Sequence, residues 1–187
     1  MKGLLAIARA IDTLNEWVGR IVYWLGLLMI ALGVYNAVVR YVGAWIGENF
    51  SSNAYLEGQW YLFGIMFMLG AAYTLRHDGH VRVDVLYATL SPRAKAWVNL
   101  LGSIALLIPF CALALYLCYD WIKFSWAIHE TSSNPGGLPR YPIKTVVPVA
   151  LVLLMLQGIS LAIHSAAVLT GDETSPTEEA DEEIKPL

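Results

Sequence analysis

The sequence predicts an all-α integral membrane protein with four transmembrane helices and an N-terminal amphipathic interfacial helix. Hydrophobic residues make up 57% of the 187 positions and charged residues only 14%, with a mean hydropathy of +0.55, which is more apolar than ordinary soluble domains. The apolar residues gather in four runs long enough to cross a bilayer, which takes about 20 helical residues. Trp and Tyr side chains, which favour the membrane interface, border these runs. A membrane domain is therefore expected over residues 17–170.

The first 16 residues follow a different pattern. Apolar positions recur there at helical spacing among charged residues, namely Lys2, Arg9, Asp12 and Glu16. This pattern is typical of a helix that lies on a membrane surface. We expect an amphipathic interfacial helix over residues 1–16; the alternative is a solvated start that runs straight into the first span.

The first span is expected at about residues 21–39. One narrow sector of this helix collects small and polar side chains, namely Gly26, Gly33, Asn36 and Arg40. Small residues let helices approach closely, and polar residues in a membrane seek partners. We expect this face to pack against protein rather than lipid.

The second span is expected at about residues 58–75 and is rich in Gly and Ala. Glu57 stands at its start. It is interpreted either as a plain acidic residue, favourable at a helix N-terminus, or as the ion-pair partner of Arg40 or Arg140. We favour the plain interpretation.

The third span is expected at about residues 98–119, in a helix that begins at Ser91-Pro92, because Ser caps free amides and Pro suits the first helical position. Pro109 predicts a kink within it. The two cysteines, Cys111 and Cys118, are seven residues apart in this apolar run, so we interpret them as small buried residues rather than a disulfide.

A long external loop follows, with the sequence SSNPGGLPRYP. Its Pro and Gly residues end helices and prescribe turns. We expect it to be an external docking surface in which Glu130 and Arg140 take part.

The fourth span is expected at about residues 146–169. Gln157, Ser160 and His164 lie on one face of it, and polar groups at that depth are costly without partners. They should face another helix, in this chain or in a second subunit. The tail over residues 171–187 holds seven of the fifteen acidic residues and is expected to be disordered.

Basic residues set the orientation. With four spans, eight Lys and Arg residues fall on the side of the termini and of the central connection, and four fall on the other side. The side richer in Lys and Arg is normally cytoplasmic. We expect a multi-pass inner-membrane protein with both termini in the cytoplasm.

The sequence contains no Walker-type phosphate loop and no suggestive grouping of catalytic residues, so we expect no enzyme. The alternative function is a redox membrane anchor that binds haem between His77 and His164. Against it stands the simpler interpretation of loop histidines plus one membrane histidine satisfied by a hydrogen bond.

The central stretch carries a family resemblance. Residues 57–98, EGQWYLFGIMFMLGAAYTLRHDGHVRVDVLYATLSPRAKAWV, resemble the DctQ-like small membrane subunit of tripartite ATP-independent periplasmic (TRAP) transporters. The resemblance is sharpest over residues 79–84, Gly-His-Val-Arg-Val-Asp, after the acidic Glu57 that opens the second span.

This resemblance implies a subunit of a secondary transporter for organic acids, usually driven by sodium and independent of ATP. A periplasmic binding protein would capture the substrate, and a large membrane subunit would carry the substrate and sodium sites. The present chain would be a scaffold in the bacterial inner membrane, in contact with the lipid bilayer, with no cofactor of its own and no nucleic-acid partner.

The resemblance also gives the central motif two interpretations. His80, Arg82 and Asp84 either contact the large subunit or lipid headgroups, or Arg82 and Asp84 only pair locally and hold the turn while Gly79 supplies backbone freedom. We expect a short interfacial helix in this segment, before Ser91.

Overall fold

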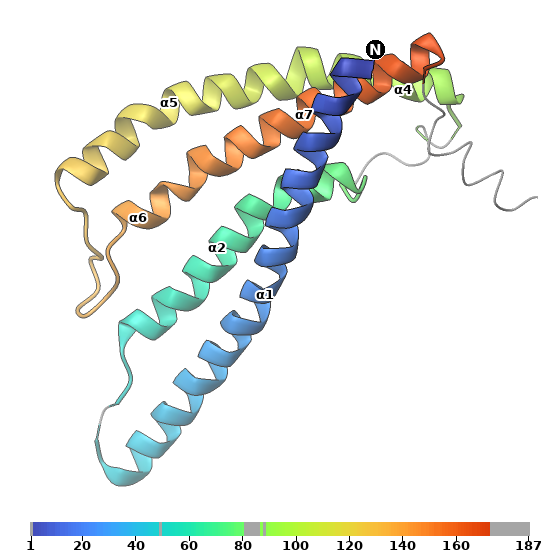
Figure 1. The fold of residues 1–187 in the computed structure, drawn as a ribbon. Coiled ribbons are helices and arrows are strands. Elements are labelled where there is room, and N and C mark those ends of the chain that lie inside the picture. Colours follow the sequence, from blue (N-terminus) through green and yellow to red (C-terminus); the bar gives the residue numbers. More distant parts are fainter. Residues whose placement is uncertain (1, 49, 81–86, 88, 173–187) are drawn as a thin grey trace, which may run out of the picture.

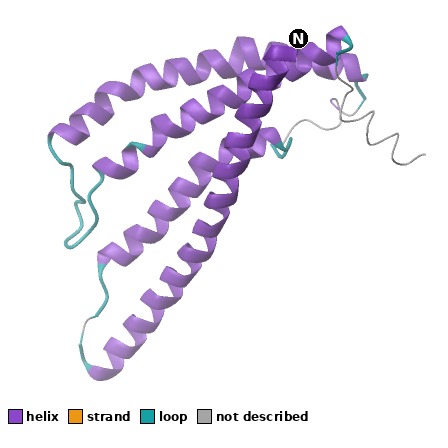
Figure 2. Cartoon of the chain, viewed as in Figure 1, coloured by secondary structure: helices purple, strands orange, loops and turns teal. Residues whose placement is uncertain are grey.

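The structure is a computed structural model that describes residues 2–48, 50–80, 87 and 89–172. Within these ranges it is entirely helical (Figure 2), which confirms the predicted all-α class. The elements, in chain order, are α1 (Lys2–Ile46), α2 (Asn53–Arg76), α4 (Pro92–Gly102), the π-helical turn η1 (Ser103–Leu107), α5 (Ile108–Ala127), α6 (Tyr141–Lys144) and α7 (Val146–Thr170).

Three stretches of helix are long and apolar enough to cross a membrane, among the residues that the structure describes. They are Lys2–Ile46, Pro92–Ala127 and Tyr141–Thr170. The helix α2, which contains the predicted second span, has 24 residues but falls outside this set because polar and aromatic side chains dilute its apolar content. Many large apolar side chains face outward, with Trp45 91% exposed and Tyr41 81% exposed, as expected for helices covered by lipid or by a partner.

The first helix is longer than expected. It runs without a break for 45 residues, which at 1.5 Å per residue is about 67 Å, roughly twice the thickness of the hydrocarbon layer. The sequence of α1 contains no proline, and nothing else interrupts its hydrogen bonds. Residues 2–16 of this segment are therefore the first third of α1 rather than a separate element.

The helices form two pairs joined through α7 (Figure 1). Helix α1 runs down one side and α2 returns beside it, whereas α5 and α7 form the other pair. Helix α7 also packs on α1, α2 and α4, and the N-terminal part of α1 crosses it. The two pairs diverge toward their loop ends, so α7 is the element that holds the bundle together.

The predicted start of the third membrane helix is confirmed. Ser91 caps α4 by accepting a hydrogen bond from the Ala94 amide, with a 3.3 Å N···O distance, and Pro92 occupies the first turn. Pro109 lies in the first turn of α5, two residues after the end of η1, in which the backbone hydrogen bonding is π-helical. Proline removes an amide donor and disturbs the preceding turn, so the expected irregularity takes the form of this π-helical turn.

Glycine allows α1 and α2 to approach closely. A Cβ atom on Gly19 would lie 2.1 Å from the Tyr73 ring, which no real contact permits. Further along the same side, a Cβ on Gly26 would lie 3.4 Å from Met66, and one on Gly33 would lie 3.1 Å from Gln59. The Gly26 and Gly33 positions of the predicted packing face therefore lie against α2.

Candidate functional site

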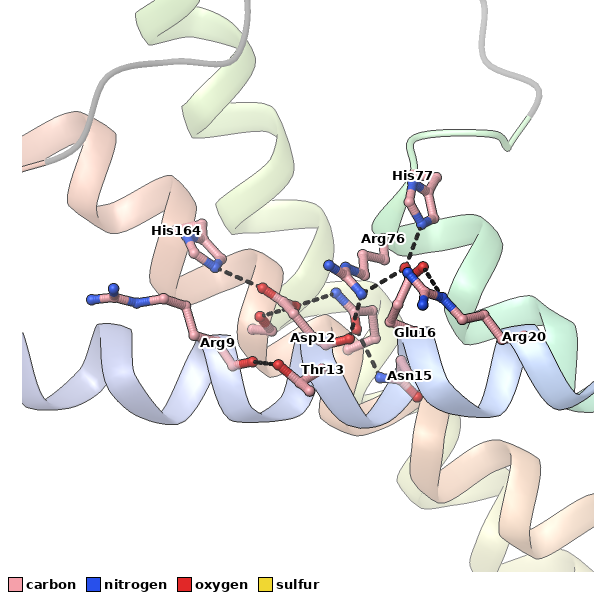
Figure 3. Close-up of polar contacts among 11 residues, drawn as sticks. Arg9, Asp12, Thr13, Asn15, Glu16, Arg20, Arg76, His77 and His164 are labelled. Atoms are coloured by element: carbon pink, nitrogen blue, oxygen red, sulfur yellow. Dashed lines mark hydrogen bonds and ion pairs between the residues drawn. The ribbon is translucent and has the colours of Figure 1, made fainter.

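A cluster of polar side chains lies where the N-terminal part of α1 crosses α7 (Figure 3). Asp12 is its centre. Its Oδ1 atom accepts hydrogen bonds from Ser160 Oγ at 2.7 Å and Gln157 Nε2 at 2.9 Å. Its Oδ2 atom lies 3.0 Å from His164 Nε2. One carboxylate thus contacts all three polar side chains of the predicted α7 face.

A second residue of α1 completes this contact. Asn15 Nδ2 donates to Gln157 Oε1 at 2.7 Å, and Ser160 Oγ also lies 3.2 Å from the Ala8 carbonyl oxygen. Asn15, Gln157 and Ser160 are at most 3% exposed. Buried polar groups are tolerated when they are hydrogen-bonded, so the α7 face finds its partner inside the chain. We call this group, Asp12, Asn15, Gln157, Ser160 and His164, the crossing cluster.

Asp12 and Asn15 were not among the predicted site residues. A signal was present: Ala8, Asp12, Asn15 and Gly19 recur at spacings of four and three residues, and such positions share one face of a helix. Asp12 was interpreted as one of the charged residues of an interfacial helix, whereas in the structure it contacts α7.

Glu16, next to the crossing cluster, ties α1 to the end of α2. Its Oε2 atom accepts from Arg76 Nη1 at 2.7 Å and lies 2.9 Å from His77 Nε2, and its Oε1 atom accepts from Arg20 at 3.1 Å. Arg76 also donates to the Asp12 carbonyl oxygen at 2.6 Å. Asp12 and Glu16, one helical turn apart on α1, therefore connect α1 to α7 and to the end of α2.

The two histidines proposed as haem ligands belong to these clusters. His77 Nε2 contacts Glu16, and His164 Nε2 contacts Asp12, so each of these nitrogens already has a carboxylate partner. Among the described residues, no group of three or more His, Cys, Asp and Glu side chains is placed to hold a metal ion. The geometry fits hydrogen-bonded histidines better than an open ligand pair.

At the opposite end of the bundle, Glu57 is buried by the long loop. Only 2% of it is exposed. Its carboxylate accepts hydrogen bonds from Ser132 Oγ, from Asn134 Nδ2 at 2.9 Å and from the Leu138 amide at 2.6 Å. The interpretation of Glu57 as a plain helix-terminal acid is therefore wrong: this carboxylate organises the loop that follows α5.

Gly137 fits this arrangement because it has no side chain. A Cβ atom there would lie 2.5 Å from the Ser132 Cβ and 2.6 Å from Glu57 Oε2. The Asn53 side chain, one turn before Glu57, donates to the Pro135 carbonyl at 2.9 Å. The loop is thus fastened to the start of α2.

The predicted docking residues Glu130 and Arg140 lie in the same loop. Glu130 pairs with Lys144 and accepts from Ser125 Oγ at 2.7 Å; these contacts lower the pKa of Glu130, the Lys144 hydrogen bond most of all. The guanidinium of Arg140 lies over the Trp60 ring at 5.9 Å. Both residues shape the loop itself, and docking to another protein stays a prediction.

Of the central motif, the structure describes Gly79 and His80. The Gly79 amide donates to the Thr74 carbonyl oxygen at 2.9 Å, and His80 Nε2 lies 3.3 Å from the Ala71 carbonyl oxygen. Both contacts fold the connection back on the last turns of α2. Arg82 and Asp84 lie outside the described residues, as do most of the expected interfacial helix and the acidic tail from residue 173 onward.

The clusters place polar side chains at helix contacts and at the contact of the long loop with α2. Residues 29–167 match the family described as the DctQ component of tripartite ATP-independent periplasmic transporters. The chain belongs to the DctQ family. The match covers α1 from its middle onward and every later helix, so the predicted family is confirmed.

A curated protein with a DctQ name is similar to part of the chain. The chain is 30% identical over 105 residues to the C4-dicarboxylate TRAP transporter small permease protein DctQ of Pseudomonas aeruginosa. That alignment covers 55% of this chain and 50% of the relative, so the chain spans about half the length of this curated relative. No solved structure matches the chain.

Proposed function

We propose that this chain is the small scaffold subunit of a TRAP-type secondary transporter that imports organic acids with an ion gradient and without ATP. It would work with a large membrane subunit and a periplasmic binding protein. The observation that carries the proposal is the family match over residues 29–167. The name of the Pseudomonas relative supports a dicarboxylic acid as the class of substrate.

We further propose the four-span topology. Helix α2 has 24 residues and returns beside α1 (Figure 1), so if α1 crosses the bilayer, α2 must re-cross it. Both termini would then be cytoplasmic, with the N-terminal third of α1 at the inner surface, the crossing cluster near that surface and Glu57 at the outer end. The excess of Lys and Arg on the inner side supports this orientation.

A scaffold role agrees with how the polar side chains are used. Asp12, Glu16 and Glu57 all bind other parts of the same chain, and they hold helices and the long loop in place rather than lining a shared substrate pocket. The substrate and sodium sites are therefore proposed for the large subunit. Residues 79–84 and the loop with Glu130 and Arg140 are proposed contacts to partners or lipid headgroups.

Affinity capture from the native membrane tests this function. Tagged chain extracted in mild detergent should bring along a much larger multi-span membrane protein, identified by mass spectrometry, whereas an unrelated tagged membrane protein should not. Recovery of a flavin or iron–sulfur subunit, together with a Soret band in the intact purified protein, would instead support the haem anchor and contradict the proposal.

A further inference from the structure

A groove follows the seam between α1 and α2 near their outer ends. Its volume is about 450 Å³. The α1 side supplies small and polar residues, and α2 supplies Leu56 and Gln59; the α1 residues are Gly33, Asn36, Ala37, Arg40, Tyr41 and Ala44. We call these six residues the outer face of α1.

Asn36 is the first unusual feature of this face. The residue is only 5% exposed, yet its Oδ1 atom is buried without a hydrogen bond to any residue that the structure describes. A buried amide oxygen without a partner costs about 1–3 kcal/mol. Gln157, an amide on α7 that is 3% exposed, is by contrast hydrogen-bonded through both of its polar atoms.

Arg40 is the second unusual feature. It lies one helical turn beyond Asn36 on the same side of α1 and is exposed. No hydrogen bond or ion pair joins its side chain to any part of the chain that the structure describes. Glu57, which the less favoured alternative paired with Arg40 or Arg140, is hydrogen-bonded to the long loop. The positive charge of Arg40 therefore has no carboxylate partner among the described residues. Charged groups in such positions normally have partners.

We propose that the outer face of α1 binds a transmembrane helix of the large subunit, which places a carboxylate against Arg40 and a hydrogen-bonding side chain against the Asn36 amide. This inference rests on the proposed function. Ala37 and Ala44 leave room for close approach of another helix, as small residues do in membrane interfaces. A helix with an acidic residue at this depth would fill the groove, give the Asn36 amide a hydrogen-bond partner and pair with the charge of Arg40.

A phospholipid satisfies this face less completely. Its phosphate can pair with Arg40, but its acyl chain offers no hydrogen bond to an amide, so Asn36 would stay unpaired. The buried amide therefore favours a protein helix over lipid as the occupant. The lipid is a separate outcome of the experiment below.

The test compares capture of the large subunit by variants of the tagged chain. Arg40→Glu should lower the amount captured about tenfold, because a charge-assisted pair becomes a repulsive one, and Arg40→Gln should lower it less. Lys123→Gln is the matched control, since Lys123 is an exposed cation on α5, away from the groove; it should capture as much as the wild type. Equal melting temperatures of the variants in detergent show that the chain itself still folds.

A photo-crosslinking residue in place of Ala37 provides a second readout. It should crosslink to the large subunit, whereas the same residue in place of Leu113, which is 58% exposed on α5, should crosslink to it less. Crosslinks from position 37 to lipid alone, or full capture by Arg40→Glu, would overturn the proposed surface while leaving the proposed function in place. Failure of the wild-type chain to capture any large subunit would overturn the proposed function itself.

Discussion

Near its N-terminus α1 places Asp12 and Asn15 against α7, and near its C-terminus it places Asn36 and Arg40 along the seam with α2. At the crossing cluster each side chain finds at least one partner within 3.0 Å. At the outer face, an amide oxygen is buried alone and a guanidinium is unpaired among the described residues. Each region also holds one buried amide oxygen without a partner among the described residues, Asn15 Oδ1 at the crossing cluster and Asn36 Oδ1 at the outer face. The regions differ in their charged residue: Asp12 is hydrogen-bonded within the chain, whereas Arg40 has no such partner in the described part of the chain.

The difference separates two uses of polar residues in a membrane helix. Where the partner is in the same chain, the polar group stabilises the subunit. Where the partner is absent, the same group marks a surface that another molecule should complete. The stability of the isolated subunit should therefore respond to changes at the crossing cluster and stay nearly unchanged by changes at the outer face.

The largest effect on stability is expected for Asp12→Ala. The change removes the acceptor that Gln157, Ser160 and His164 of α7 share, although Ser160 keeps its contact with the Ala8 carbonyl oxygen. We expect a loss of about 2–3 kcal/mol in the free energy of unfolding, since hydrogen bonds to a charged group contribute about 1.5–3 kcal/mol. Unfolding of the purified chain by sodium dodecyl sulfate in mixed micelles measures it. Thr13→Ala is the control, because Thr13 is exposed and bonds only to its own helix, at Arg9. Equal stability of the two variants would mean that the crossing cluster contributes nothing.

The next largest effect on stability is expected for Gly19→Ala, which tests how closely α1 approaches α2. The added methyl group would lie 2.1 Å from Tyr73, and overpacking of this kind costs about 1–3 kcal/mol. Gly64→Ala on α2 is the matched control, because a Cβ there meets nothing within 4 Å and alanine favours helix. The same unfolding assay should rank Gly19→Ala below wild type and Gly64→Ala at or above it; the reverse order would contradict the close approach of the two helices.

A local effect is expected for Glu57→Gln. The amide replaces one carboxylate oxygen by a donor, which then faces either the Asn134 side-chain donor or the Leu138 backbone amide, so the loop should open more often. Tryptic cleavage after Arg140 should become about fivefold faster, because proteolysis follows the population of locally open states. Glu48→Gln changes an exposed acid and should leave the rate unchanged. An unaltered cleavage rate in Glu57→Gln would show that this carboxylate does not hold the loop.

The smallest effect on the isolated chain is expected for Asn36→Leu. Replacing an unpaired buried amide by an apolar side chain of similar size removes a desolvation cost, so the free energy of unfolding should stay within about 0.5 kcal/mol of wild type or rise. Capture of the large subunit should nevertheless fall. A marked loss of stability without loss of capture would contradict the difference proposed between the crossing cluster and the outer face, since it would mean that Asn36 already has its partner within the chain.

The sequence was informative where the determinant is local. The cap at Ser91 and Pro92 is a matter of neighbouring residues and is confirmed. The need of Gln157, Ser160 and His164 for a partner also follows from their spacing in an apolar helix. Which helix supplies that partner depends on contacts of more than 140 residues in sequence separation, and no local pattern specifies those.

Glu57 was misinterpreted for the same reason. Its partners come from residues 132–138 of a loop about 75 residues further on. The sequence around a helix-terminal acid is the same whether or not a distant loop covers that acid.

Composition, apolar run length and capping residues thus determined by themselves that the chain is a helical membrane protein with its helices near the observed places, because the hydrocarbon layer imposes helix length and internal backbone hydrogen bonding on any sequence. The family was predicted from residues 57–98 for a different reason, because these residues resemble known subunits. The tertiary structure alone decided that α1 is continuous, that Asp12 closes the contact with α7 and that Glu57 fastens the long loop. These three features depend on how whole helices cross and pack against one another. The spacing of side chains along one helix does not specify which other helix it will cross.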